Sequence, residues 1–401
     1  MSIRSLTYSL IILLISIPAS AGVKISLDDE KSIDLGLRLQ GYYHYRDSNV
    51  ISDRGQSDFR IRRARIRIKG QIKPWLSSFL QTGYSEDSDT SNASMKIIDA
   101  YIRAQVSDKL QVTLGQHMAP ALRQNITSAS AIMAIDRPSI TYKSLTWGTR
   151  SVAGMNSFTM NNTDANLDGS VNVRDIGLTL TSHQQWKNVH AKYYFGVYDG
   201  AKTALSDRLT ARVQFNYGDE EKYFFNRSTY LGKKQTLSLG FSYDEQKEVA
   251  RDGSTFTAVD YKLYSVDLFL EQKFAGGSLN IEAAQIRLDL NDAKQLVTFN
   301  ESKILGAFTG LHVQGEGAYI QSGYYKNAWQ PWLAFESWKS DADLDEGSFH
   351  AWKAGINYYF DDQKANLKIG YELLSSESAF GSPYGEDDNI KTFVIGLFVD
   401  L

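Results

Sequence analysis

The chain has no cysteine and only six prolines among its 401 residues. Without cysteine it can form no disulfide framework, no thiolate metal site and no thiol nucleophile. Its formal net charge is only −3, which implies no general affinity for nucleic acid. Beyond the N-terminal region, no stretch reaches the roughly 18 consecutive apolar residues that indicate a membrane-spanning helix. If the chain crosses a membrane, it therefore does so with strands.

The N-terminus has the pattern of a secretory signal. Arg4 precedes an apolar run from Leu10 to Ile17, and Pro18-Ala19-Ser20-Ala21 follows the run. The run is shorter than the roughly 20 residues that a spanning helix needs, and Ala19-Ser20-Ala21 has the form of a cleavage site. The pattern predicts a signal peptide over residues 1–21, cleaved near Ala21, and an exported domain over residues 22–401.

Aromatic residues are abundant, with 23 tyrosines and 19 phenylalanines, and many stretches alternate between polar and apolar residues. Both features are typical of β-strands. One stretch places cations on one face and apolar residues on the other: Arg63, Arg65, Arg67 and Lys69 against Ala64, Ile66 and Ile68. This period of two predicts a strand with a wet and an apolar side. Cations in line need water, counter-ions or anionic partners, which an aqueous lumen supplies and a solvated surface could also supply. The phase reverses before Arg63, which predicts a β-bulge near Arg62 or an exit into a loop.

Similar alternation predicts sixteen strands along the chain, an even number, as in bacterial single-chain barrels. The predicted strands cover residues 31–46, 58–72, 76–86, 95–105, 110–117, 174–182, 189–199, 207–217, 235–245, 260–274, 277–289, 313–325, 329–340, 348–360, 363–374 and 390–401. Short connections alternate with long ones, as at the two rims of a barrel. Residues 218–234 break this rule, so either a strand extends through Tyr223-Phe224-Phe225 or the boundaries differ there. The expected fold is all-β, a transmembrane antiparallel β-barrel.

The connection over residues 118–173 differs in kind, because it lacks sustained alternation. It carries four cations that are candidates for a pore: Arg123, Arg137, Lys143 and Arg150. Loops this long are uncommon unless they are functional or disordered. We expect an inward-folding constriction loop, the third of the long loops, and a surface flap is the alternative.

The last strand alternates to the end of the sequence. Its apolar face consists of Phe393, Ile395, Leu397, Val399 and Leu401. Such a strand is expected to close the barrel against the first strand. It also resembles the C-terminal signal that the barrel-assembly machinery reads, with Leu401 in place of the usual aromatic residue.

Several short motifs follow one another in a recognisable order. They are Phe59-Arg60-Ile61-Arg62-Arg63-Ala64-Arg65-Ile66, Lys69-Gly70, Asp99-Ala100-Tyr101-Ile102, Leu114-Gly115-Gln116, Ala119-Pro120, Ile135-Asp136-Arg137 and Phe195-Gly196-Val197-Tyr198-Asp199-Gly200. Together they resemble the porin O and P family, the phosphate-selective porins of Gram-negative outer membranes. The resemblance implies a sixteen-stranded, usually trimeric barrel with a basic lumen and an inward third loop.

The resemblance makes the basic residues candidates for lining a pore and binding small anions. Arg63, Arg65 and Arg67 would form a ladder of cations along which anions pass, and the further candidates are Arg38, Lys69, Arg123, Arg137, Lys143 and Arg150. The third loop shows no lysine cluster of the kind on which the family's selectivity depends. We therefore expect a passive, anion-preferring outer-membrane porin, with phosphate or polyphosphate as candidate permeants but without strict phosphate selectivity.

Three alternatives stay open. A general porin would balance its arginines with lumenal carboxylates such as Asp34, Asp99, Asp267 and Glu282. A receptor or adhesin could use the acidic loops of the same barrel. An outer-membrane enzyme such as a lipase would need a grouped catalytic set, but the six histidines are scattered and none lies in a nucleophile-elbow or metal-spacing motif. We predict no enzyme activity and no cofactor, and the expected partners are membrane lipid, lipopolysaccharide, the barrel-assembly machinery and two further copies in a homotrimer.

Overall fold

The computed structural model describes ten parts of the chain. They are residues 22–46, 56–85, 95–142, 174–200, 204, 206–293, 296–297, 314–341, 348–376 and 389–401. The predicted signal peptide, Lys143, Arg150 and the rest of residues 143–173 lie outside the described residues, so those predictions remain predictions.

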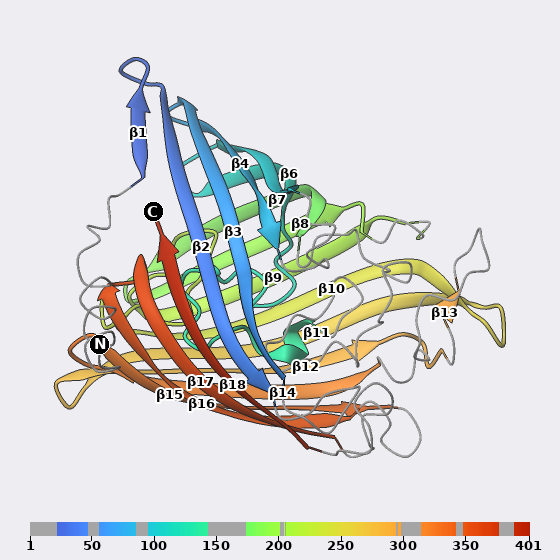
Figure 1. Ribbon diagram of the computed structural model, residues 1–401. Helices are drawn as coiled ribbons and strands as arrows, with labels where there is room; N and C mark the ends of the chain where they lie inside the picture. The colour runs from blue at the N-terminus through green and yellow to red at the C-terminus, as the bar shows by residue number, and fades with distance from the viewer. Residues whose placement is uncertain are drawn as a thin grey trace, which may run out of the picture.

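Within the described residues, eighteen strands form one antiparallel sheet (Figure 1). The strands are β1 (Val23–Ser26), β2 (Ser32–Arg46), β3 (Gln56–Lys73), β4 (Leu76–Ser85), β5 (Lys96–Gln105), β6 (Leu110–Met118), β7 (Arg174–Trp186), β8 (Val189–Tyr198), β9 (Arg208–Gly218), β10 (Thr236–Asp252), β11 (Ala258–Phe274), β12 (Gly277–Asp289), β13 (Leu296–Val297), β14 (Gly315–Tyr325), β15 (Trp329–Ser340), β16 (Phe349–Asp361), β17 (Ala365–Ser376) and β18 (Asn389–Asp400). The 3-10 helix η2 covers Ser139–Tyr142.

The wall of the barrel consists of all these strands except the short β1 and β13. Each wall strand pairs with the next one along the chain, and β12 pairs with β14. β18 pairs with β2 from Thr392 opposite Arg46 to Asp400 opposite Arg38, which closes the ring. Leu401 continues this pairing, because its backbone N–H donates to Leu37 at 2.7 Å. The predicted sixteen-stranded antiparallel barrel is confirmed.

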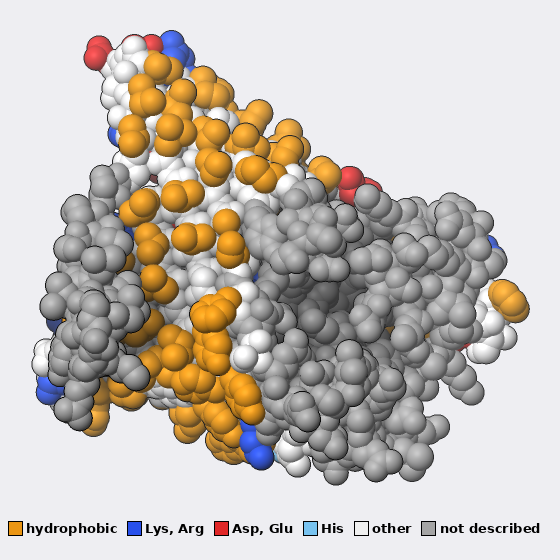
Figure 2. Space-filling model, in the orientation of Figure 1, with side chains coloured by type: hydrophobic (Ala, Val, Ile, Leu, Met, Phe, Trp, Pro, Cys, Tyr) orange, Lys and Arg blue, Asp and Glu red, His pale blue; other side chains and the backbone are white. Residues whose placement is uncertain are grey.

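The wall carries polar side chains on its inner face and apolar ones on its outer face. On β11 the buried, inward residues include Ser265 and Asp267, whereas Val266 and Leu268 are exposed on the outside. Figure 2 shows hydrophobic side chains gathered over the outer surface of the wall. This arrangement is the one that lipid outside and water inside would favour. Among the described residues, no helix is long and apolar enough to span a membrane.

The predicted bulge in β3 is confirmed at Arg62. Gln40 of β2 lies opposite Arg63, and the next residue, Gly41, lies opposite Ile61, so Arg62 is the extra residue. As a result, Arg62 and Arg63 are both buried, with 6% and 3% of their surface exposed. The bulge therefore places two consecutive guanidinium groups inside the barrel.

Short turns gather at one end of the barrel, which we call the short-turn end. The turns include 74–75, 187–188, 275–276 and 362–364, and the C-terminus lies at the same end. Several turn residues have a positive φ, for example Lys187 at 53° and Ala275 at 48°. Such turns allow antiparallel strands to reverse within two or three residues.

The connection over residues 219–235 contains no strand, so the expectation that a strand extends through Tyr223-Phe224-Phe225 is wrong. β9 ends at Gly218 and β10 begins at Thr236, close to the predicted boundaries. The segment between them folds into the barrel, and its Phe224 ring packs edge-on against Tyr194 of β8 at 5.4 Å. The aromatic triplet therefore anchors a buried connection.

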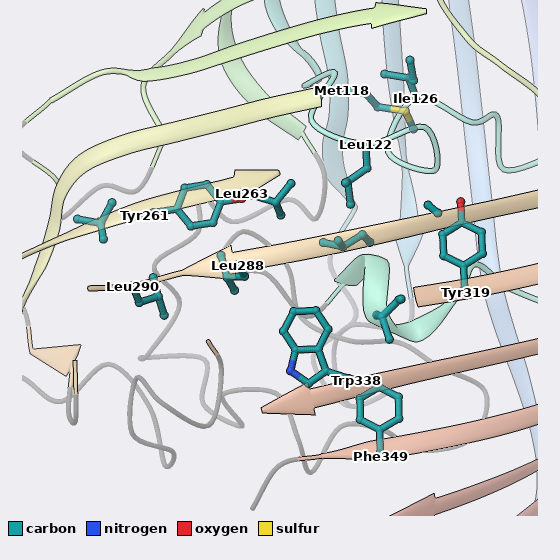
Figure 3. Packing of buried hydrophobic residues seen from close by; sticks show 14 of the residues in the cluster. Met118, Leu122, Ile126, Tyr261, Leu263, Leu288, Leu290, Tyr319, Trp338 and Phe349 are labelled. Atoms are coloured by element: carbon teal, nitrogen blue, oxygen red, sulfur yellow. The ribbon is translucent and has the colours of Figure 1, made fainter. Parts of the chain in front are cut away.

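The described part of the third long connection, residues 119–142, also lies inside the wall. Its apolar side chains Leu122, Ile126 and Ile140 are buried. They belong to a cluster with inward residues of the strands, which include Tyr261, Leu263, Leu288, Tyr319, Trp338 and Phe349 (Figure 3). Towards the long-loop end, the inner face of β11 to β16 is thus apolar, and burial of this patch holds the segment against the wall.

Candidate functional site: the polar interior of the barrel

Two of the predicted pore-lining arginines, Arg67 of the ladder and Arg38 of β2, share one carboxylate at the end of β18. Arg38 donates from Nη2 to Asp400 Oδ2 at 2.9 Å, and Arg67 forms an ion pair with the other oxygen of Asp400. Arg67 also donates to the backbone oxygen of Leu401 at 2.7 Å. The positive charge of this pair of arginines is therefore partly neutralised. Lys69, further along the same face of β3, is exposed.

Arg62 and Arg63 share a second carboxylate, Asp136, from the internal segment 119–142. Arg62 donates from Nε to Asp136 Oδ2 at 2.7 Å, and Arg63 donates from Nη2 to Oδ1 at 3.2 Å. Burial favours the neutral acid, but the neighbouring guanidinium groups outweigh it and hold the pKa of Asp136 well below its usual range. The bulge in β3 thus fixes the segment to the wall with charge-assisted bonds.

Arg65 differs from its neighbours on β3. Only 4% of its surface is exposed, and among the described residues its Nε and Nη1 atoms have no hydrogen-bond partner. The carboxylate that interacts electrostatically with Arg65 is Asp99, which already accepts hydrogen bonds from Arg174 Nε at 2.8 Å and from Gln81. A buried guanidinium with unfilled donors is costly unless an anion or water fills them.

Arg123 and Arg137 lie inside the barrel, but both are engaged in holding the internal segments. Arg123 donates to Glu221 Oε1 at 2.8 Å and to Oε2 at 3.0 Å, and its guanidinium lies 4.2 Å from the centre of the Phe269 ring. Arg137 donates from Nε to the backbone oxygen of Gln124 at 2.9 Å. The geometry gives both arginines a positioning role.

Glu221 is the meeting point of several donors. It accepts from the Tyr230 hydroxyl at 2.6 Å and from Gln214 Nε2 at 2.7 Å, in addition to Arg123. Burial alone would raise the pKa of Glu221, but Arg123 outweighs burial and lowers that pKa well below its usual range. The carboxylate is therefore charged and fully occupied.

The two internal segments are bound to one another. Asn226 donates its backbone N–H to Ile126 at 2.8 Å, and Ser128 donates to the Asn226 oxygen at 3.1 Å. Lys192 of β8 holds one segment, because its Nζ donates to the backbone oxygen of Glu221 at 2.7 Å. Lys368 of β17 holds the other segment through the oxygens of residues 132–134. Sequence reasoning missed both lysines, because no local pattern marks a lysine as a partner of a distant backbone.

Further charged pairs line the wall between neighbouring strands. They are Arg174 with Asp99, Arg208 with Asp244 and Asp175, Arg212 with Asp267, and Lys353 with Glu336 and Glu372. Glu282 instead accepts from the neutral Tyr319 hydroxyl at 2.7 Å. Most of the described lumenal arginines are thus balanced by carboxylates, and Arg65 is the exception on β3.

The chain resembles known proteins both in sequence and in fold. A model of the family described as phosphate-selective porin O and P matches residues 33–379. An uncharacterized protein of Aquifex aeolicus is 22% identical over 360 residues, which cover 82% of this chain and 78% of that protein. An anion-selective porin from Comamonas acidovorans has a TM-score of 0.55 at 12% identity, over 93% of this chain and 100% of that chain.

A second solved structure, the trimer form of the outer-membrane protein OmpT of Vibrio cholerae, has a TM-score of 0.53 at 9% identity. The match covers 93% of this chain and all of that chain. At these identities the two solved structures show a shared fold alone.

Proposed function

Because the chain belongs to the phosphate-selective porin O and P family, we propose that it forms a passive, water-filled channel of the Gram-negative outer membrane that prefers anions. The family and the barrel fold point to a channel rather than to an enzyme. The apolar outer face and the polar inner face suit a barrel in lipid. The preference for anions depends on the charge inside the lumen.

Arg65 is the observation that carries this preference. Among the described residues, two of its N–H donors have no hydrogen-bond partner and it forms no ion pair, so a phosphate or carboxylate anion would supply both. Arg38, Arg63 and Arg174 lie near Arg65, but each already has a carboxylate partner, so the attraction for an anion depends mainly on Arg65 itself. One such contact, rather than a cage of donors, would bind an anion weakly enough for it to leave again.

We therefore expect one principal anion contact, at Arg65, in place of a continuous ladder of arginines. Arg63 and Arg67 already have carboxylate partners in Asp136 and Asp400, so they contribute less to attraction than their number implies. We therefore propose a modest anion preference, with phosphate and polyphosphate as candidate permeants. Lys69, Lys143 and Arg150 stay candidates for the pore lining.

A general, weakly selective porin is the second candidate function. The observation that favours it is the pairing of lumenal arginines with carboxylates, as in Arg174 with Asp99 and Arg212 with Asp267. The two candidates differ in whether Arg65 has a measurable effect on ion selectivity.

We further propose that the short-turn end faces the periplasm and the long loops face outward, as in bacterial barrels. Residues 1–21 act as a cleaved signal, and the barrel-assembly machinery reads β18 in this proposal. A homotrimer is proposed because the family resemblance implies one and a protein of similar fold is described in a trimer form. Contacts with membrane lipid and lipopolysaccharide follow from the proposed location.

Reversal potentials in planar bilayers under a chloride gradient test the proposal. We expect the wild-type channel to prefer chloride, Arg65→Glu to reduce that preference, and added phosphate to reduce the chloride current of the wild type more than that of the variant. Lys326→Glu is the matched control, because it makes the same charge change at an exposed turn residue that is not among the pore-lining candidates. Weak selectivity that Arg65→Glu leaves unchanged would favour the general porin, and the lack of any channel would favour a receptor.

A further inference from the structure

A cavity of 780 Å³ lies at the short-turn end of the barrel. One side is formed by inner-face residues of β5 to β7, such as Arg103 and Thr181, and the other by residues 222–227 of the internal segment. Arg65 is not among the lining residues. The volume falls within the about 300–1,000 Å³ typical of sites for small organic ligands, and it is far larger than an inorganic anion needs.

The lining is strongly basic. Arg103, Lys109, Lys222 and Arg227 line the cavity with a single carboxylate, Asp108. Within the described part of the chain none of these four cations forms an ion pair, in contrast to the arginines higher in the lumen. Arg103 donates from Nε to Thr113 Oγ1 at 3.3 Å, and among the described residues its buried Nη2 has no hydrogen-bond partner. An anion in the cavity would meet uncompensated positive charge.

The same cavity has an aromatic lining. Tyr223, Phe224 and Phe225 all line it, and 77% of the Tyr223 surface is exposed. The Arg103 guanidinium lies 5.3 Å from the centre of the Phe224 ring, so cation and ring form one surface. Phe224 is fixed by its contacts with Phe225 and Tyr194. The exposed Tyr223 ring, in contrast, offers apolar surface that a bound ligand could cover.

We propose that this cavity is a binding site for an organic anion that carries a flat, aromatic group, such as an aryl phosphate. The four cations would bind the charged end, and Tyr223 and Phe225 would pack against the ring. The site lies at one mouth of the proposed pore and is separate from the Arg65 contact. The inference goes beyond the proposed function, because binding here requires no conduction of ions.

Binding of phenyl phosphate to the detergent-solubilised, full-length protein tests the inference by isothermal titration calorimetry. Lys222→Gln/Arg227→Gln removes two exposed cations of the cavity without touching the packed wall. We expect this double variant to bind phenyl phosphate about tenfold more weakly than the wild type, since charge-assisted contacts are lost. Tyr223→Ser should weaken phenyl phosphate but leave inorganic phosphate unchanged.

Lys326→Gln is the matched control, because Lys326 is an exposed cation in a short turn at the same end and does not line the cavity. Arg65→Gln separates this inference from the proposed function: it should alter ion selectivity but leave phenyl phosphate affinity unchanged, because the Arg65 contact holds an anion only weakly. Equal binding by the wild type and the double variant would overturn the proposed site, as would equal affinity for inorganic phosphate and phenyl phosphate, or no binding at all.

Discussion

Arg123 and Glu221 join two segments that enter the barrel from opposite ends. Arg123 belongs to residues 119–142, which follow β6 at the long-loop end, and Glu221 belongs to residues 219–235, which connect β9 and β10 at the short-turn end. The Arg123 Nη2 atom lies 2.8 Å from Glu221 Oε1, and both side chains are fully buried. This buried ion pair therefore links the two segments inside the barrel, and neither segment could form it alone.

Glu221→Ala should destabilise the protein by about 3–5 kcal/mol, because it leaves the charge of Arg123 buried without a partner. Denaturant unfolding followed by tryptophan fluorescence measures this change in the free energy of unfolding. Lys233→Ala is the control on the same segment, because Lys233 pairs with Asp362 at the surface and should change stability little. If both variants unfolded at the wild-type denaturant concentration, the ion pair would not hold the interior together.

The pKa values of two buried carboxylates, Asp136 and Glu221, predict how the free energy of unfolding depends on pH. The folded-state pKa values of Asp136 and Glu221 are depressed, because the neighbouring arginines outweigh the effect of burial. Such groups contribute stability above their unfolded pKa of about 4, and the contribution is lost as the pH falls through the lower folded value. We expect their contribution to be constant from about pH 7 to 5 and to decline below about pH 4.

Denaturant unfolding at a series of pH values checks this prediction. Glu221→Gln should lose less stability than the wild type between about pH 4 and 2, because it has one depressed carboxylate fewer. An identical decline in both proteins would show that other groups control the acid response.

Much of the wall could be predicted from the sequence, because lipid and lumen impose a period of two on every strand. β12 and β15 begin and end at the predicted residues, 277–289 and 329–340. The change of phase before Arg63 also predicted the bulge at Arg62. These features depend on neighbours along one strand, and the sequence records them directly.

The interior could not be predicted in the same way. Arg38 and Asp400 are 362 positions apart and become partners only when β18 closes on β2. The sequence gives one indication that residues 219–235 fold inward, since this connection is too long for a short turn. Its aromatic triplet Tyr223-Phe224-Phe225 has the composition of a strand, which made a strand one of the two expectations there. Contacts that depend on closure of the ring are not encoded in any local period.

We predict that Arg65 does not stabilise the folded protein, because its proposed role in anion binding leaves its guanidinium without a protein partner among the described residues. Its guanidinium is buried near other arginines and has unfilled donors, so Arg65→Gln should leave the free energy of unfolding unchanged or raise it by about 1 kcal/mol. Arg63→Gln, at the neighbouring inward position, should instead lower it by about 1–3 kcal/mol, since it breaks bonds to Asp136 and Gln40. Parallel denaturant titrations compare the two, and a similar loss in both would mean that Arg65 has a structural partner.

Lys368 should control how firmly residues 119–142 are held. Its Nζ is buried and donates to the backbone oxygens of Met133 and Ala134 at 3.3 and 3.2 Å, and also to Ile132. Lys368→Met would leave these carbonyls without their donor, at about 1–3 kcal/mol for each one that stays unsatisfied. We expect faster amide hydrogen exchange at residues 130–137 and unchanged exchange in β2 and β18.

Lys364→Met is the control for this measurement, because Lys364 lies four residues earlier, is half exposed and pairs loosely with Asp361 at 3.8 Å. It removes the same charge from the same end of the barrel without touching the segment. Exchange at residues 130–137 should therefore match the wild type in this control. If Lys368→Met left the exchange of these amides unchanged, the apolar cluster of Leu122, Ile126 and Ile140 would be sufficient to hold the segment, and the lysine would contribute only charge to the lumen.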